Sequence, residues 1–399
     1  MTLLRSLPLL VLAALPAPAL ARRSVTVRVP AFDVPAFHNR EICTFVTIPA
    51  RHPMNVREVV IRNIGGSESF GTHHLIVYAY TGDLAPLVAT EGQVADDTAC
   101  LNFGGGNPAN LRIFATSQAV RTREPMPHGT ALRLVPGALG GGKQAVGLVL
   151  NSHWINGTDR TRRARARVKL VFAKDREVKR ELKPIFEVIA NGTLRVPPGE
   201  TRMVGYQWAP GNPGLSRFGS FLGGSQPPDG PACVTMLIGH MHRRGTLFTA
   251  DYIDANGPTR VYTNTKYSDP PAKHFDPPLL VRTGERLTYS CTHDNGTDPR
   301  LGCEEQAGVT PGESVLQLFA QTGSAGTIDG SAHLCHTAGP DPAECPPGPD
   351  PKRPDRSFTG NCVPANLVFG FLSDDDMCIL PGYYYDADPS APAGQECVL

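Results

Sequence analysis

Short alternations of apolar and polar residues run through the chain and predict β-strands. Residues 24–29 and 163–170 alternate with a period of two, as strands with one buried face do, and residues 41–48 are rich in strand-favouring residues, with Cys43 and Phe45 on one face. The last stretch is basic, and we interpret its charges as the solvated face of a half-exposed strand. The 41 glycines and 38 prolines favour many short strands joined by turns over long helices. The pattern therefore predicts an all-β protein.

The chain is long enough to form two cores, and its composition suggests where they separate. With 399 residues, two domains are the natural expectation. A charged connector near residue 175 divides a first β-domain, residues 22–175, from a second, residues 176–399. Within the second, residues 294–371 contain a Pro-rich run and four cysteines. This stretch indicates a disulfide-tied insertion with little regular structure.

The N-terminal residues indicate export. A single basic residue, Arg5, precedes the apolar run Leu7–Leu20, and Ala19-Leu20-Ala21 fits a small-residue cleavage site. Residues 1–21 are therefore predicted to be a signal peptide, and a secreted or periplasmic location is expected. No other apolar run is long enough to span a membrane. The formal net charge of +1 gives no indication of nucleic acid as a partner.

The interpretation of the cysteines and of the glycosylation sequons depends on that location. The ten cysteines are even in number, and in an exported protein most are expected to form disulfides. Three Asn-Gly-Thr sequons begin at Asn156, Asn191 and Asn295. They are glycosylation sites only in a eukaryotic secretory pathway, and three chance Asn-Gly turns explain them equally well.

Five of the twelve histidines fall inside apolar, strand-like stretches. His240 and His242 lie in a run predicted to be a buried strand, where side chains two residues apart share a face. Both imidazoles could then reach one metal ion, and imidazole suits copper, zinc, iron and nickel. His73 and His74 are adjacent, so they would face opposite sides unless the strand twists or bulges there, which Gly71 would permit.

His153 ends the apolar run 147–153 and could meet the His73 region only through folding. Single histidines in strands are usually core residues. Two close pairs and a fifth histidine together favour a metal site.

With these motifs in view, the chain resembles the copper type II, ascorbate-dependent monooxygenases. The matching segments occur in the family's order: Thr72-His73-His74-Leu75, Leu150-Asn151-Ser152-His153-Trp154, Gly239-His240-Met241-His242 and Asp376-Met377-Cys378. The likeness spans roughly residues 25–300 and 370–390. It implies two antiparallel, jelly-roll-like β-sandwich domains with an open cleft between two copper sites.

The resemblance also implies the ligands and the chemistry. His73, His74 and His153 would hold one copper ion in the first domain, and His240, His242 and Met377 a second one. The soft Met377 thioether favours Cu(I), which suits the copper that would react with O2. Ascorbate or another external one-electron donor would reduce both ions, and a C–H bond of a small organic substrate would be hydroxylated.

The same resemblance implies two disulfides. Cys43 would pair with Cys100, and Cys291 with Cys378. The partners of six further cysteines stay open, because six cysteines allow fifteen pairings: Cys233, Cys303, Cys335, Cys345, Cys362 and Cys397.

Two departures from the family's sequence pattern leave the substrate undetermined. Ile379 and Pro381 stand where peptide- and amine-hydroxylating members have Asn and Tyr, and the segment between Cys291 and Met377 is much longer than theirs. A copper-handling protein without hydroxylase activity would use the same ligands. A zinc hydrolase with carboxylates from residues 374–376 and a plain exported β-protein are weaker alternatives.

Overall fold

A computed structural model describes most of the two β-rich regions. The described residues are 24–36, 39–66, 70–97, 100, 110–197, 199–211, 227–242, 244–295, 367–369 and 376–399, with four short strands between 303 and 358. The predicted signal peptide lies outside the described residues, as does most of the predicted insertion. The described elements are strands and a few short 3-10 helices, which confirms the all-β prediction.

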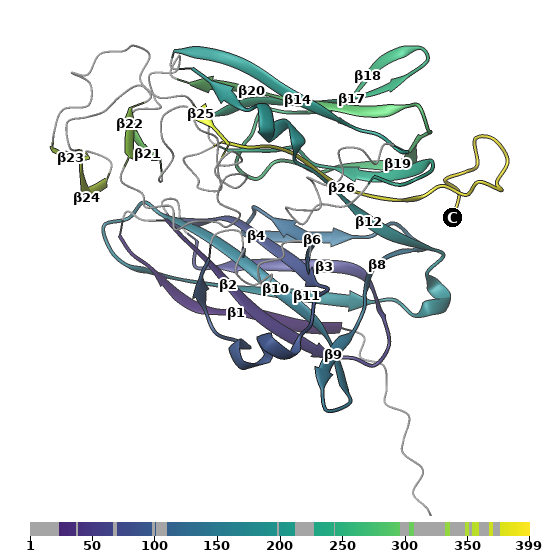
Figure 1. Cartoon of the computed structure of the whole chain (residues 1–399), viewed down its shortest axis with the longest axis horizontal. Coiled ribbons are helices and arrows are strands. Elements are labelled where there is room, and N and C mark those ends of the chain that lie inside the picture. The colour runs from purple at the N-terminus through teal and green to yellow at the C-terminus, as the bar shows by residue number, and fades with distance from the viewer. Residues whose placement is uncertain are drawn as a thin grey trace, which may run out of the picture.

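Two sheets form a sandwich in the first half of the chain (Figure 1). One sheet contains β1, β11, β3 and β8 with β7 beside β3, and the other contains β5, β2, β10, β4 and β6 with β9 beside β10. The elements are β1 (Ser24–Val34), β2 (Asn39–Pro49), β3 (Met54–Ile64), β4 (Phe70–Tyr80), η1 (Ala85–Thr90), β5 (Ala95–Asp96), β6 (Leu111–Ser117), β7 (Arg121–Pro125), β8 (Thr130–Leu134), β9 (Gly137–Gly140), β10 (Lys143–Asn156) and β11 (Arg162–Phe172).

The second half forms another pair of sheets, drawn above the first in Figure 1. One contains β12, β26, β15 and β19 with β16 beside β26, and the other contains β14, β20, β17 and β18. The elements are η4 (Asp175–Glu177), β12 (Arg180–Glu187), η5 (Ile189–Thr193), β13 (Arg195–Val196), β14 (Glu200–Trp208), β15 (Ala232–Leu237), β16 (His240–Met241), β17 (Gly245–Asp254), β18 (Gly257–Asn264), β19 (Lys273–Val281), β20 (Arg286–Asn295), β21 (Cys303–Gln306), β22 (Ala332–Cys335), β23 (Gly348–Asp350), β24 (Arg353–Phe358), β25 (Leu367–Val368) and β26 (Cys378–Asp386).

The two sandwiches share one sheet. β12 pairs in parallel with β8 over Arg180–Leu182 and then antiparallel with β26 over Lys183–Glu187. A ten-stranded sheet therefore runs from β1 in the first half to β19 in the second. The boundary expected near residue 175 falls in the connection between β11 and β12, and the hydrogen bonding crosses it.

Alternating burial shows why these residues form strands. Along β11, Ala164, Ala166, Val168 and Leu170 are buried and the residues between them are exposed. This agrees with the sequence interpretation of residues 163–170 as a strand with a solvated basic face. In contrast, β15 is buried at every position from Ala232 to Leu237, because Cys233 and Met236 pack in the core of the first half while Val234 and Leu237 pack in the core of the second.

Three disulfides cross-link the described residues: Cys43–Cys100, Cys233–Cys397 and Cys291–Cys378. The first and third confirm the expected pairings, and the second resolves two of the six cysteines left open. Such bridges are typical of oxidising compartments. The side chains of Cys303, Cys335, Cys345 and Cys362 lie outside the description. No helix in the described residues is long and apolar enough to cross a membrane.

The three sequon asparagines are buried structural residues. Asn156 donates to the carbonyl oxygens of Val34 and Pro35, and Asn295 donates to that of Val196. Asn191 accepts from the backbone N–H of Cys378. With exposed fractions of 0 to 1%, none of the three can carry a glycan in the folded protein.

Candidate metal centre

β10 is the central strand of the first histidine set, and its neighbours place a row of side chains across the sheet. His153 on β10 lies directly opposite Glu41 on β2 and opposite His74 on β4. Residues directly opposite on adjacent strands project from the same face. The ladder thus brings together three residues that are far apart in the sequence.

A β-bulge adds His73 to this row. His153 pairs with His74, but the next residue, Trp154, pairs with Thr72, so His73 is the extra residue on β4. A bulge places two residues opposite one and re-aims a side chain. The ring centroids of His73 and His153 are 4.9 Å apart, and those of His74 and His153 are 5.1 Å apart. The bulge that the adjacent pair required is therefore present.

Gly71, which the sequence interpretation allowed to accommodate a bulge, lies two residues before the extra residue His73. It is not among the glycines with positive φ, and a side chain added there would meet no atom within 4 Å. The register shift itself, two residues further along β4, accommodates His73.

The three imidazoles have the spacing of a metal site. Their ligand nitrogens lie within 4.8 Å of one another, and Nδ1 of His73 is 3.0 Å from Nδ1 of His74. With metal–nitrogen bonds of about 2.0 Å, ligand nitrogens of a square or tetrahedral site are about 2.8 to 3.3 Å apart. His153 is fully buried, and neither of its ring nitrogens has a hydrogen-bond partner among the described atoms. A buried nitrogen in that state is costly unless it binds something.

Asn151 and Glu41 fix the orientation of His74. Nε2 of His74 donates to Oδ1 of Asn151 at 2.7 Å, and Nδ2 of Asn151 donates to Oε1 of Glu41 at 2.7 Å. This leaves Nδ1 of His74, on the side of His73, as the ring nitrogen that could bind a metal ion. Burial by itself would raise the pKa of Glu41, but the hydrogen bonds from His74 and Asn151 and the nearby His153 lower it, so the carboxylate stays ionised.

The second histidine pair sits on a shorter strand than the sequence suggested. The predicted continuous strand breaks at Ile238 and Gly239, between β15 and β16. Both strands still pair with β26, so β15 and β16 form one ladder with β26 that is interrupted at these two residues. His240 lies on β16 and His242 directly after it, and their ring centroids are 5.2 Å apart.

Asp376 joins the segment of Met377 to that of His242. β16 pairs antiparallel with the start of β26, so His242 follows one strand where Met377 precedes the other. Oδ1 of Asp376 accepts hydrogen bonds from the backbone N–H groups of His242, at 3.1 Å, and Met377, at 2.7 Å. The Met377 side chain is buried within the apolar core of the second half.

The two histidine sets are in contact. The ring centroid of His73 is 4.9 Å from that of His242 and 6.3 Å from that of His240. Gln118, in the turn between β6 and β7, accepts through Oε1 from Nδ1 of His240 at 3.2 Å. This contact differs from the open cleft that the sequence suggested between the two sets.

Burial and crowding favour the neutral imidazole at His73, His153 and His240. Burial lowers the pKa of His153 to about 3, and the pKa of His73 falls well below its usual value through burial and the four neighbouring histidines. The pKa of His240 is lowered in the same direction, again chiefly by burial. A neutral imidazole can offer a lone pair to a metal ion, and an imidazolium cannot.

His293 is a buried histidine that the sequence interpretation left aside. It is not one of the five histidines in apolar stretches of the sequence, but β20 carries it into the interior, where it is fully buried. Its Nδ1 lies 3.1 Å from Oδ2 of Asp376. His293 and the two cysteines Cys291 and Cys378 are close enough to hold a metal, but those cysteines form a disulfide and offer no thiolate.

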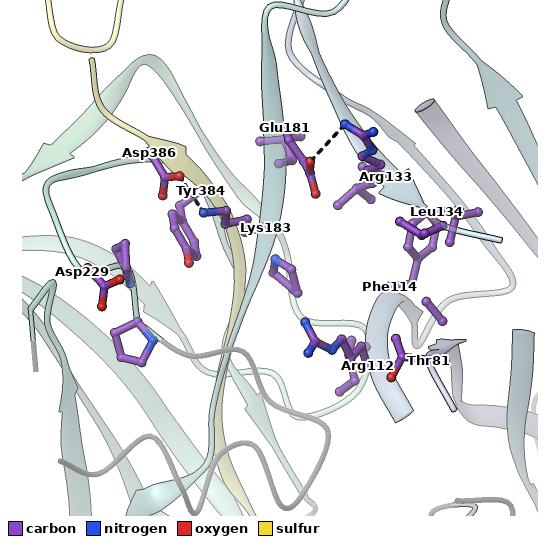
Figure 2. A pocket seen from close by; sticks show the side chains of 18 of the residues that line it. Thr81, Arg112, Phe114, Arg133, Leu134, Glu181, Lys183, Asp229, Tyr384 and Asp386 are labelled. Carbon is purple, nitrogen blue, oxygen red and sulfur yellow. Dashed lines mark hydrogen bonds and ion pairs between the residues drawn. The ribbon is translucent and has the colours of Figure 1, made fainter. Parts of the chain in front are cut away.

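A separate cavity of about 920 Å³ lies between the two halves (Figure 2). It is lined by the other ends of β4 and β10, near Ala79 and Gly147. Five or six residues of strand separate it from the histidines, roughly 15 to 20 Å at the rise of a strand. Figure 2 shows two ion pairs on its walls, Arg133–Glu181 at 3.8 Å and Lys183–Asp386 at 2.6 Å.

Comparisons with known proteins do not assign a family. No family model matches the chain, and no curated protein matches it. A Bacteroides ovatus protein assigned as an alpha-L-fucosidase gives a TM-score of 0.18 at 8% identity, covering 68% of this chain and 35% of its own. The PBSX exported protein XepA gives 0.18 at 8% identity, covering 67% and 86%. Likeness at this level carries no argument about function.

Proposed function

We propose that the protein is an exported, copper-dependent monooxygenase that hydroxylates a C–H bond of a small organic substrate, using O2 and an external one-electron reductant. The observation that carries this proposal is the convergence of five imidazoles from β4, β10 and the β16 region on one place, where His153 and His242 are buried and the other three are half-buried. His73 contacts the other four rings, and His153 beside it has two ring nitrogens without a hydrogen-bond partner among the described atoms.

The donor set suits copper. Imidazole nitrogens accept both Cu(I) and Cu(II), and a thioether such as that of Met377 favours Cu(I). Bound copper would supply the one-electron redox chemistry and the activation of O2 that no side chain here can provide. The Met377 segment lies beside His242 through Asp376, which is the arrangement the proposed second ligand set needs.

The chain's own residues prepare both sets. Asn151 and Glu41 leave Nδ1 of His74 facing the site, and Gln118 engages Nδ1 of His240 and so leaves its Nε2. Hydrogen bonds of this kind fix the tautomer and orientation of ligand histidines. The low pKa of His153 keeps that ligand neutral at any physiological pH.

The alternative is a copper-handling protein without hydroxylase activity, and the contact between His73 and His242 favours it. A substrate that binds between the two sets requires these rings to separate, and a copper carrier does not. A zinc hydrolase is less well supported. Both oxygens of Asp376 face His293 or backbone N–H groups, and the neighbouring residues 374–375 lie outside the described residues.

Metal analysis followed by oxygen uptake tests the proposal. The purified protein is expected to bind two copper ions per chain and to consume O2 with a reductant and a hydroxylated product, screened over small organic substrates. His153→Ala and Met377→Ala should each lower turnover. Two bound copper ions with no substrate-dependent O2 uptake over a broad screen would instead support the copper-handling alternative. Stoichiometric zinc would contradict both.

A further inference from the structure

The buried pair His293 and Asp376 lies directly behind the second ligand set. Both side chains are fully buried, and Nδ1 of His293 is 3.1 Å from Oδ2 of Asp376. A carboxylate without partners in such a place would be strongly destabilising. Here Oδ1 accepts hydrogen bonds from two backbone N–H groups, and Oδ2 is in contact with the imidazole of His293.

Those two N–H groups belong to His242 and Met377. A single carboxylate oxygen thereby fixes the backbone of two residues that approach from different strands, one after β16 and one before β26. Movement of the Asp376 side chain would shift both ligand residues together. Its position in turn depends on His293, the side chain nearest to its other oxygen.

β20 holds this segment at two points, one on each side of Met377. Cys291 on β20 is bonded to Cys378, and His293, two residues further along the same face of β20, contacts Asp376. β20 and β26 belong to different sheets of the second sandwich, so these are cross-links between sheets. The backbone of Met377 lies between the two cross-links.

We propose that Asp376 and His293 are positioning residues that hold Met377 and His242 in the geometry that binds Cu(I). The inference rests on the proposed function, because it assigns Met377 and His242 as copper ligands. Hydrogen-bonded partners behind metal ligands commonly contribute about 10- to 100-fold in metal affinity. The pair should therefore matter for Cu(I), the state that needs the thioether, more than for Cu(II).

The test uses Asp376→Asn, His293→Leu and His293→Asn in the full chain, with Cu(I) affinity measured by competition against a chromophoric Cu(I) chelator. Asparagine at 293 can place an amide N–H near the position of the imidazole Nδ1, so His293→Asn should restore affinity. Asp376→Asn and His293→Leu should each lower Cu(I) affinity of the second set about 10- to 100-fold. X-ray absorption should show loss of the sulfur ligand in both.

Thr235→Val is the matched control. Thr235 is also buried and its hydroxyl donates to the carbonyl of Tyr383 on β26, far from Met377, so the variant removes a buried hydrogen bond to the same strand. It should lower stability and leave Cu(I) affinity unchanged. A double variant, Met377→Ala with Asp376→Asn, should bind Cu(I) more weakly than Met377→Ala alone, but by less than Asp376→Asn weakens the parent, because only the effect on His242 remains.

The outcomes distinguish a failure of the proposed function from a failure of the positioning role. If Met377→Ala leaves Cu(I) affinity and the sulfur signal unchanged, Met377 is not a ligand and the proposed function loses its second site. If Met377→Ala weakens Cu(I) binding but Asp376→Asn and His293→Leu do not, the copper site stands and the positioning role is wrong. If the two effects add fully in the double variant, Asp376 does not act through Met377, and the role is again wrong.

Discussion

Replacing Asn151 with leucine should weaken both the first domain and its metal site. Asn151 is fully buried and joins the imidazole of His74 to the carboxylate of Glu41 through two hydrogen bonds of 2.7 Å. Leucine has a similar size but can make neither bond. The variant leaves a buried imidazole N–H without its acceptor and a buried carboxylate without one of its donors.

The expected loss of unfolding free energy follows from the loss of those two hydrogen bonds. An unsatisfied buried group costs about 1 to 3 kcal/mol, and more when it is charged. The Asn151→Leu variant should therefore lose about 3 to 5 kcal/mol of unfolding free energy in the copper-free protein. Since His74 would no longer be held with Nδ1 facing His73, copper affinity of the first set should fall about 10- to 100-fold.

Urea unfolding gives the first quantity, and a competition titration with a Cu(II) chelator gives the second. Thr130→Val is the matched control, because Thr130 is also buried in the first sandwich and its hydroxyl donates to the carbonyl of Pro127 at 2.7 Å, in the sheet that does not carry His74. It should lose stability and keep copper affinity. Unchanged copper affinity in Asn151→Leu would refute the argument that His74 is a ligand oriented by Asn151.

Three further outcomes are expected. Met377→Ala should bind Cu(II) nearly as the parent does but bind Cu(I) at least about tenfold more weakly, which a pair of chelator competitions would measure. Burial raises the pKa of Glu124 to about 7, so its carboxyl stabilises the fold when protonated, and that contribution is lost as the pH rises through 7. Glu124→Gln should accordingly gain about 2 kcal/mol relative to the parent between pH 5.5 and pH 8.5 in urea unfolding. Replacing Cys233 and Cys397 by alanine opens a bridge that spans 164 residues; it should cost about 4 kcal/mol without changing copper stoichiometry, as unfolding and metal analysis would show.

Local periodicity was enough to predict the strands and part of the site. The alternation in residues 163–170 appears as the burial pattern of β11, and the even cysteine count agrees with the disulfides that were found. Asn151 could also have been found, because it precedes His153 by two residues on the same face of β10.

Other features depend on contacts between distant segments, which no local pattern encodes. The bulge at His73 is a register shift against β10, and its position cannot be read from β4 alone. The contact between His73 and His242 depends on how the two sandwiches sit against each other. His293 lies in a polar stretch of sequence, and only the packing of β20 against β26 shows that it is buried.

The parallel pairing of β8 with β12 has a practical consequence for anyone who wishes to study the halves separately. A chain cut at residue 175 would leave β8 with an unpaired edge in one fragment and β12 with an unpaired edge in the other. Open strand edges recruit other strands, so both fragments are expected to self-associate. Leu182, which packs in the apolar core of the first half, would also be removed from it. A soluble first half would need to extend past β12 or carry charged substitutions on β8.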